Sequence, residues 1–169
     1  MTASKATPIR TALRSDSTLR PLVKDGLGAL LRDDRARIDG AVATTIGDSL
    51  DIDEAFRPGH ESQNRWDYLL GHTPTGELVA LEPHSANEGE ISVVIKKREG
   101  ALTHLREHLE PGTTVSRWFW VASGAVGFVP FEKAILRLSQ NGITFVGRKL
   151  LPKDMPTAKV TKPTGKSKR

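Results

Sequence analysis

Hydrophobic positions change their spacing along the chain, and these changes predict a succession of helices and strands. Apolar side chains at helical spacing predict one helix over residues 19–31. The stripe Ile38, Val42, Ile46 and Leu50 predicts a second helix. Asp51-Ile-Asp-Glu54 has the form of a capping box at the start of a further helical turn, which Pro58-Gly59 ends.

The pattern then takes the period of a strand. Residues 65–71 alternate between apolar and polar, residues 77–82 form a second strand-like segment, and His72-Thr-Pro-Thr-Gly76 between them is typical of a turn. This arrangement predicts an antiparallel hairpin. Beyond it we expect a helix from Ser85 or Asn87 to about Glu110, a strand over 115–122, a helix over 131–140 and a strand over 143–148. The order predicts an α/β fold with a mixed central sheet and flanking helices.

The two ends of the chain lack such patterns. Residues 1–17 are rich in threonine, serine and alanine, and we expect a flexible N-terminal arm. Residues 152–169 contain three prolines and five lysines, which predicts a disordered basic C-terminal tail. Residues 18–151 would then form a single domain, which suits a chain of 169 residues.

Composition narrows the class of protein. The chain has no cysteine, which excludes a disulfide scaffold, zinc fingers and thiol catalysis. It has no apolar run near the roughly 18 residues of a membrane span, and its first residues lack the apolar segment of a secretory signal. We therefore expect a cytoplasmic protein that does not associate with a membrane.

Charge is unevenly distributed. The net charge is +5, yet residues 38–95 carry a net −9, the segments on either side carry +4 each, and residues 149–169 carry +6. Basic flanks and a basic tail favour nucleic acid as the partner. The acidic segment between them coincides with the predicted hairpin.

The hairpin contains the residues with the clearest chemistry. A turn centred between Pro74 and Thr75 sets Asp67 opposite Glu82 on one face, with Cβ atoms roughly 5 Å apart. Two facing carboxylates repel each other unless a cation lies between them, and Mg²⁺ binds one or two carboxylates together with waters and substrate phosphate. His84, two residues after Glu82, shares that face.

Two alternatives remain open for this pair. A register shifted by one residue puts the two acids on opposite faces of the sheet. The acids are otherwise exposed carboxylates on a solvated face, paired with Arg65 or Arg117.

An acid on one strand, a short hairpin and Glu82-x-His84 on the next strand resemble the core of the PD-(D/E)XK nuclease superfamily. The resemblance covers roughly residues 38–148. It implies a restriction-endonuclease-like αβββαβ core in which Asp67 and Glu82 bind Mg²⁺ or Mn²⁺. It also implies a basic residue that orients the attacking water. The chain differs from the family in having His84 in the place of lysine, and no proline precedes Asp67.

The resemblance suggests further site residues. The basic group is either His84 or a lysine of the following helix, as in some members of this superfamily, and here Lys96 and Lys97 are candidates. A solvated helix face is the alternative for these two lysines. The family often uses an acid on its first helix, which makes Glu54 a candidate metal ligand, although Glu54 would equally serve as a capping residue.

The expected function is Mg²⁺-dependent hydrolysis of phosphodiester bonds in DNA or RNA. Cations outside the hairpin would hold the nucleic-acid backbone, and the candidates are Arg98, Lys162, Lys166, Lys168 and Arg169. The alternative is a non-catalytic module that binds nucleic acid or a protein partner, a second copy included, through its basic flanks and tail. Trp118 and Trp120 share one face of a strand, where they either stack bases or, as we expect, belong to the core.

Overall fold

A mixed sheet is the centre of the fold. The computed structural model describes residues 6–126 and 132–158. Within them the sheet has six strands: β1 (Lys24–Asp25), β2 (Ile46–Asp51), β3 (Tyr68–His72), β4 (Glu77–Ala86), β5 (Val115–Val126) and β6 (Ile143–Phe145). The spatial order of the strands is their order in the sequence. The pairs from β1 to β4 are antiparallel, whereas β4–β5 and β5–β6 are parallel.

Helices connect and cover the strands. They are α1 (Pro8–Ala12), α2 (Arg32–Arg35), α3 (Gly40–Ala43), α4 (Ile52–Phe56), α5 (Ile91–Arg106) and α6 (Glu132–Gln140), with 3₁₀ turns at η1 (Arg20–Leu22), η2 (Glu88–Glu90) and η3 (Pro152–Asp154). Among the described residues, no helix combines the length and the apolar character that crossing a membrane requires. A parallel strand pair needs a crossover connection, and α5 and α6 supply the two crossovers.

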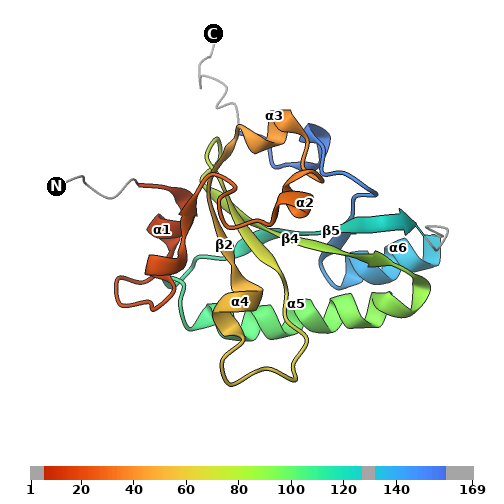
Figure 1. Cartoon of the computed structure of the whole chain (residues 1–169), viewed down its shortest axis with the longest axis horizontal. Helices are drawn as coiled ribbons and strands as arrows, with labels where there is room; N and C mark the ends of the chain where they lie inside the picture. Colours follow the sequence, from red (N-terminus) through yellow and green to blue (C-terminus); the bar gives the residue numbers. More distant parts are fainter. Residues whose placement is uncertain (1–5, 127–131, 159–169) are drawn as a thin grey trace, which may run out of the picture.

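Two hydrophobic clusters, one on each face of the sheet, join it to the elements that cover these faces, so that the fold has three layers. The first, which we call the α5-side core, joins α1, α4, α5 and α6 to one face of the sheet. The second, the α3-side core, joins α3 and the segment around Leu150 and Met155 to the other face. Figure 1 shows α5 running along one side of the sheet, with α2 and α3 on the opposite side. The expected α/β class with a mixed central sheet is confirmed.

The predicted hairpin and the elements after it agree well with the structure. β3 and β4 pair in the expected antiparallel arrangement, and Gly76 adopts a φ of +72° in the turn between them. The long helix, the tryptophan-bearing strand and the last helix appear as α5, β5 and α6. Asn141-Gly142 was expected to end that last helix, and Gly142 has a φ of +73° there.

The helices expected between residues 19 and 50 are wrong. Residues 19–31 form η1, the short strand β1 and turns, and Gly26 has a φ of +53°, outside the helical region. The stripe beginning at Ile38 divides between α3 and the strand β2. Residues four apart share a face in a strand as well as in a helix, so this spacing did not distinguish the two.

Both expected boundaries of the domain also shift outward. Residues 8–12, assigned to a flexible arm, form α1, whose Ile9 is fully buried in the α5-side core, as is the adjacent Leu13. At the other end, Met155 is 6% exposed and belongs to the α3-side core. The expectation of flexibility for 1–17 and of disorder from 152 onward is therefore wrong at these positions. The remainder of the expected tail, residues 159–169, lies outside the described residues.

Candidate active site

The hairpin register sets Asp67 against Glu82. β3 and β4 pair Tyr68 with Leu81, and one further step along this register puts Asp67 opposite Glu82. The backbone N–H of Asp67 donates a 2.8 Å hydrogen bond to Oε1 of Glu82. The register predicted from the turn is confirmed, and the alternative shifted by one residue is excluded.

Alternation along β4 directs Glu82 toward α5. Leu78, Ala80 and Ala86, which lie an even number of residues from Glu82, belong to the α5-side core. Glu82 has an exposure of 0%, so a charged group is enclosed among apolar side chains. A buried carboxylate needs a partner of opposite charge or several hydrogen bonds.

Lys97 of α5 is that partner. Its Nζ donates a 2.5 Å hydrogen bond to Oε2 of Glu82. Burial by itself lowers the pKa of Lys97, but the charge and the hydrogen bond of Glu82 outweigh it, and the pKa is raised above its ordinary value. Lys97 is therefore a fixed ammonium in the site. Its neighbour Lys96 is exposed, as expected of a residue on a solvated helix face.

The Asp67 carboxyl group, unlike Glu82, has no ion-pair partner among the described residues. Burial, followed by repulsion from Glu82, raises the pKa of Asp67 to about 8, and Lys97 offsets only part of this effect. The Asp67 carboxylate accepts no hydrogen bond from any residue in the described part of the chain. Its backbone is nevertheless fixed, because its carbonyl accepts a 2.9 Å hydrogen bond from the N–H of Ile52. The site thus holds a well-positioned carboxyl group that is protonated near neutral pH.

His84 lies between two carboxylates. Its Nδ1 is 3.5 Å from Oε2 of Glu82, and its Nε2 is 3.2 Å from Oε1 of Glu90 without the alignment of a hydrogen bond. The hydroxyl of Ser85 donates to the same Glu90 oxygen at 3.3 Å. The imidazole is 19% exposed, so solvent reaches it. His84 joins Asp67, Glu82 and Lys97 in one cluster.

Glu90 did not emerge from the sequence as a site residue. It ends η2, immediately before α5 begins. Asn87 precedes it by three residues, which is the spacing of a capping box, and the N–H of Glu90 donates to the carbonyl of Asn87 at 2.9 Å. That spacing was the available signal that Glu90 lies at the start of the crossover helix, close to the end of β4.

Glu54 does not join the cluster. Its side chain is 66% exposed and pairs with Arg57 at 3.2 Å, while its N–H donates to the side chain of Asp51, which caps α4. The expectation that Glu54 points toward the sheet depended on a helix through Leu50, and that segment is a strand. The other acid of α4, Asp53, does raise the pKa of Asp67, although its carboxylate is held by Arg65 at 2.9 Å.

The remaining candidates for nucleic-acid contact divide into two groups. Arg98 lies with Cζ 5.3 Å from the ring centroid of Trp118 and is partly buried there. Trp118 and Trp120 are 3% and 0% exposed, which confirms that they belong to the core and are not an open platform for bases. The tail candidates Lys162, Lys166, Lys168 and Arg169 lie outside the described residues.

Few side chains in the site could bind a metal ion. Among residues 6–126 and 132–158, no three His, Asp or Glu side chains gather as a ready-made metal site. Asp67 and Glu82 therefore provide at most a two-carboxylate site. Such a pair suits Mg²⁺, which retains several waters, better than a metal that requires a complete set of protein ligands.

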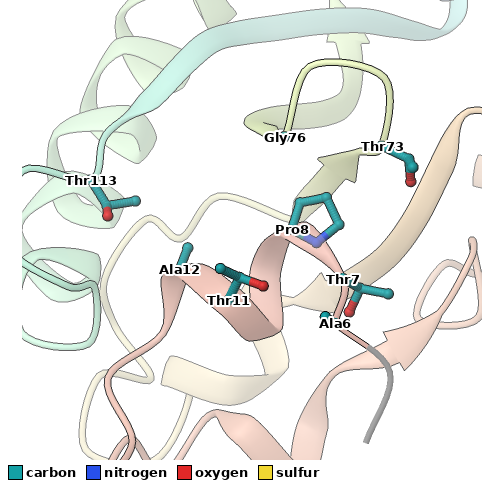
Figure 2. Close-up of a pocket in the computed structure, with 8 residues that line it drawn as sticks. All are labelled: Ala6, Thr7, Pro8, Thr11, Ala12, Thr73, Gly76 and Thr113. Atoms are coloured by element: carbon teal, nitrogen blue, oxygen red, sulfur yellow. The ribbon is translucent and has the colours of Figure 1, made fainter.

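Cavities elsewhere in the fold offer different chemistry. A cavity with a volume of about 340 Å³ lies between α1 and the turn that joins β3 to β4. Figure 2 shows the residues that line it. Its wall consists of small apolar and hydroxyl side chains, and it includes no ionisable group. This cavity therefore offers no group for acid–base or metal-binding chemistry, in contrast to the Asp67–Glu82 cluster.

No family model, curated protein or solved structure matches the chain.

Proposed function

We propose that the protein is a divalent-metal-dependent nuclease-like domain of the PD-(D/E)XK type, which hydrolyses phosphodiester bonds in DNA or RNA. The observation that carries this proposal is the meeting of Asp67 and Glu82 on neighbouring strands with the ammonium of Lys97 against Glu82. Two acids and a lysine are the residue types that the resemblance implies. The lysine comes from the crossover helix instead of from the position occupied by His84.

The order of elements supports the same proposal. α3 precedes the three antiparallel strands β2, β3 and β4, and α5 then crosses over to β5, which is parallel to β4. Apart from the short helix α4 between β2 and β3, this order is compatible with the succession αβββαβ that the resemblance implies. The acids occupy the second and third strands of that succession.

The two carboxylates fit a divalent cation. Each oxygen of Glu82 accepts one hydrogen bond, from Asp67 N–H and from Lys97, and a carboxylate has about four lone-pair positions, so capacity remains. The Asp67 carboxylate accepts no hydrogen bond from a described residue, and burial together with the charge of Glu82 raises its pKa to about 8, so its charged form lacks a sufficient counter-charge within the described protein. A bound Mg²⁺ would supply electrophilic activation of the phosphodiester.

The protein's own groups have distinct roles in this proposal. Lys97, held by Glu82, presents a fixed positive charge that orients water or phosphate oxygen beside the acids. His84 is 19% exposed and lies beside Glu82, and an imidazole can both accept and donate a proton, so it is the candidate to move a proton. The buried core behind Glu82 keeps bulk water away from that carboxylate, whereas Asp67 is partly exposed.

Cleavage assays on the full chain test the proposal. We would incubate the protein with labelled single- and double-stranded DNA and RNA, with Mg²⁺, Mn²⁺ or a chelator. We expect cleavage only with a divalent cation, and we expect Asp67→Asn, Glu82→Gln and Lys97→Met to reduce it by roughly a hundredfold or more. Glu54→Gln is the matched control, since it removes an exposed carboxylate outside the cluster. Absence of cleavage of all four substrates, or full activity of Asp67→Asn, would contradict the proposal.

One observation favours a second candidate function, a non-catalytic nucleic-acid-binding module. The charge of Glu82 is already balanced by Lys97 in a buried ion pair, an arrangement that also occurs for purely structural reasons. This candidate predicts binding that weakens steeply with salt and no cleavage. Isothermal titration with Mn²⁺ separates the two, because only the nuclease-like domain should lose ion binding in Asp67→Asn.

A further inference from the structure

A second cavity lies on the outer side of the α5–β5 contact. Its volume is about 300 Å³, near the lower end of small-molecule sites. Its apolar wall comes from Leu102, Leu105 and Leu109 on the α5 side and from Val115 and Trp118 in β5. The lining residues do not include any member of the Asp67–Glu82 cluster.

Arg98 lines this cavity next to Trp118. Its guanidinium lies over the ring of Trp118 and is also close to Gly142. A Cβ at Gly142 would come within 2.7 Å of Nη2, so the glycine is needed for this close approach. Burial lowers the pKa of Arg98, with only partial compensation from the neighbouring Glu99.

The hydrogen-bonding capacity of this guanidinium is unused. Nε of Arg98 is buried without an acceptor, and no residue in the described ranges accepts a hydrogen bond from its terminal nitrogens. A partly buried guanidinium usually binds a carboxylate, a phosphate or carbonyl oxygens. Arg98 therefore presents fixed donors beside an apolar cavity without a protein acceptor among the described residues.

The cavity wall carries positive charge, which favours an anionic ligand. Arg106 also lines the cavity, two helical turns or roughly 12 Å along α5 from Arg98. Thr113 and Thr114 add hydroxyl groups, and no carboxylate is among the lining residues. An anion with an apolar body complements this wall: the body contacts the leucines and the anionic head meets the arginine.

We propose that this cavity binds a small carboxylate with an apolar chain, its head group on Arg98 and its chain along Leu102, Leu105 and Leu109. The site is separate from the acid cluster, because successive helical residues point about 100° apart and Lys97 faces Glu82. The proposal does not depend on nuclease activity.

Isothermal titration with a matched series of eight-carbon compounds tests it. We expect octanoate to bind more tightly than octanol, and octylammonium to bind least. Arg98→Leu should weaken octanoate binding by roughly tenfold to a hundredfold and leave octanol binding nearly unchanged. Lys96→Leu is the matched control, because it removes the same charge from an exposed position of α5 and should not alter octanoate binding.

A second variant separates binding in the cavity from loss of folding. Leu102→Phe fills the cavity without removing charge, and it should abolish binding of both octanoate and octanol while thermal unfolding remains cooperative. In NMR spectra, the indole N–H signal of Trp118 should shift when octanoate is added. The signal that is missing in the spectrum of Trp118→Phe assigns it to Trp118. The proposal is overturned if octanoate does not bind at millimolar concentration or if octylammonium binds as tightly as octanoate. It is also overturned if Lys96→Leu weakens octanoate binding as much as Arg98→Leu does.

Discussion

The titration of Asp67 gives the sharpest test of the site's electrostatics. Replacing Asp67 with Asn removes the titrating group and keeps the shape of the side chain. Because the carboxylate accepts no hydrogen bond from a described residue, the substitution leaves no described donor unsatisfied. We therefore expect the variant to fold like the parent protein and to differ from it mainly in the pH dependence of its stability.

The direction and size of the pH effect on stability follow from the pKa of Asp67. The folded-state pKa of Asp67 is about 8, above the 3.8 of an ordinary aspartate, so across that window the folded protein holds a proton that the unfolded chain has lost. Stability contributed by this group is complete below the lower value and is lost as pH rises through the upper one. The loss is about 1.4 kcal/mol per pH unit, or roughly 3 kcal/mol between about pH 5 and about pH 7.

Urea denaturation at a series of pH values measures this directly. The free energy of unfolding of the parent should fall relative to that of Asp67→Asn by roughly 3 kcal/mol over that range, since all other titrating groups are common to both. Asp16→Asn, at an exposed loop position, is the control and should follow the parent. A difference between parent and Asp67→Asn that is independent of pH would refute the reasoning, since Asp67 would then ionise as an ordinary aspartate.

Two further substitutions test buried charges. Lys97→Met leaves the Glu82 carboxylate buried without its cation, and we expect it to lower the free energy of unfolding by about 3–5 kcal/mol. The double variant Glu82→Gln/Lys97→Met should recover much of this loss in the same denaturation assay, and equal losses in both variants would contradict the pairing. Asp48→Ala removes the fully buried carboxylate that accepts hydrogen bonds from the backbone N–H groups of Ile9 and Arg10, so it should cost about 2–3 kcal/mol and speed hydrogen exchange in α1. Parent-like exchange of those amides would show that Asp48 does not hold α1.

The two halves of the fold differed in how far the sequence predicted them. After Trp66 each element has a strong local signal: strand alternation, a turn with Gly76, a long amphipathic helix and a glycine at the end of α6. Before it, the apolar positions repeat every four residues, a spacing common to helices and strands. β2 forms because its neighbours β1 and β3 satisfy its backbone, which is information that the local pattern does not contain.

The prediction for the two terminal segments was wrong for a related reason. Residues 8–12 make a helix too short to be stable alone, and α1 is held by the side chain of Asp48, some forty positions away in the sequence. Met155 is likewise fixed by packing in the α3-side core. Composition indicated flexibility at both ends because neither long-range contact is visible in a local window.

The sequence by itself predicted the pairing of Asp67 with Glu82, because the position of a short turn indicates the register of a hairpin, and it left open a register shifted by one residue that the observed strand pairing excludes. It left several basic partners open for these acids: His84 and the lysines of α5, which the resemblance suggests, and Arg65 or Arg117. Only the tertiary structure decided among these: the rotation and position of α5 against the sheet bring Lys97 to Glu82 and leave Lys96 in solvent. That geometry depends on how the leucines and valines of α5 pack against β4 and β5, and packing is a property of the assembled layers.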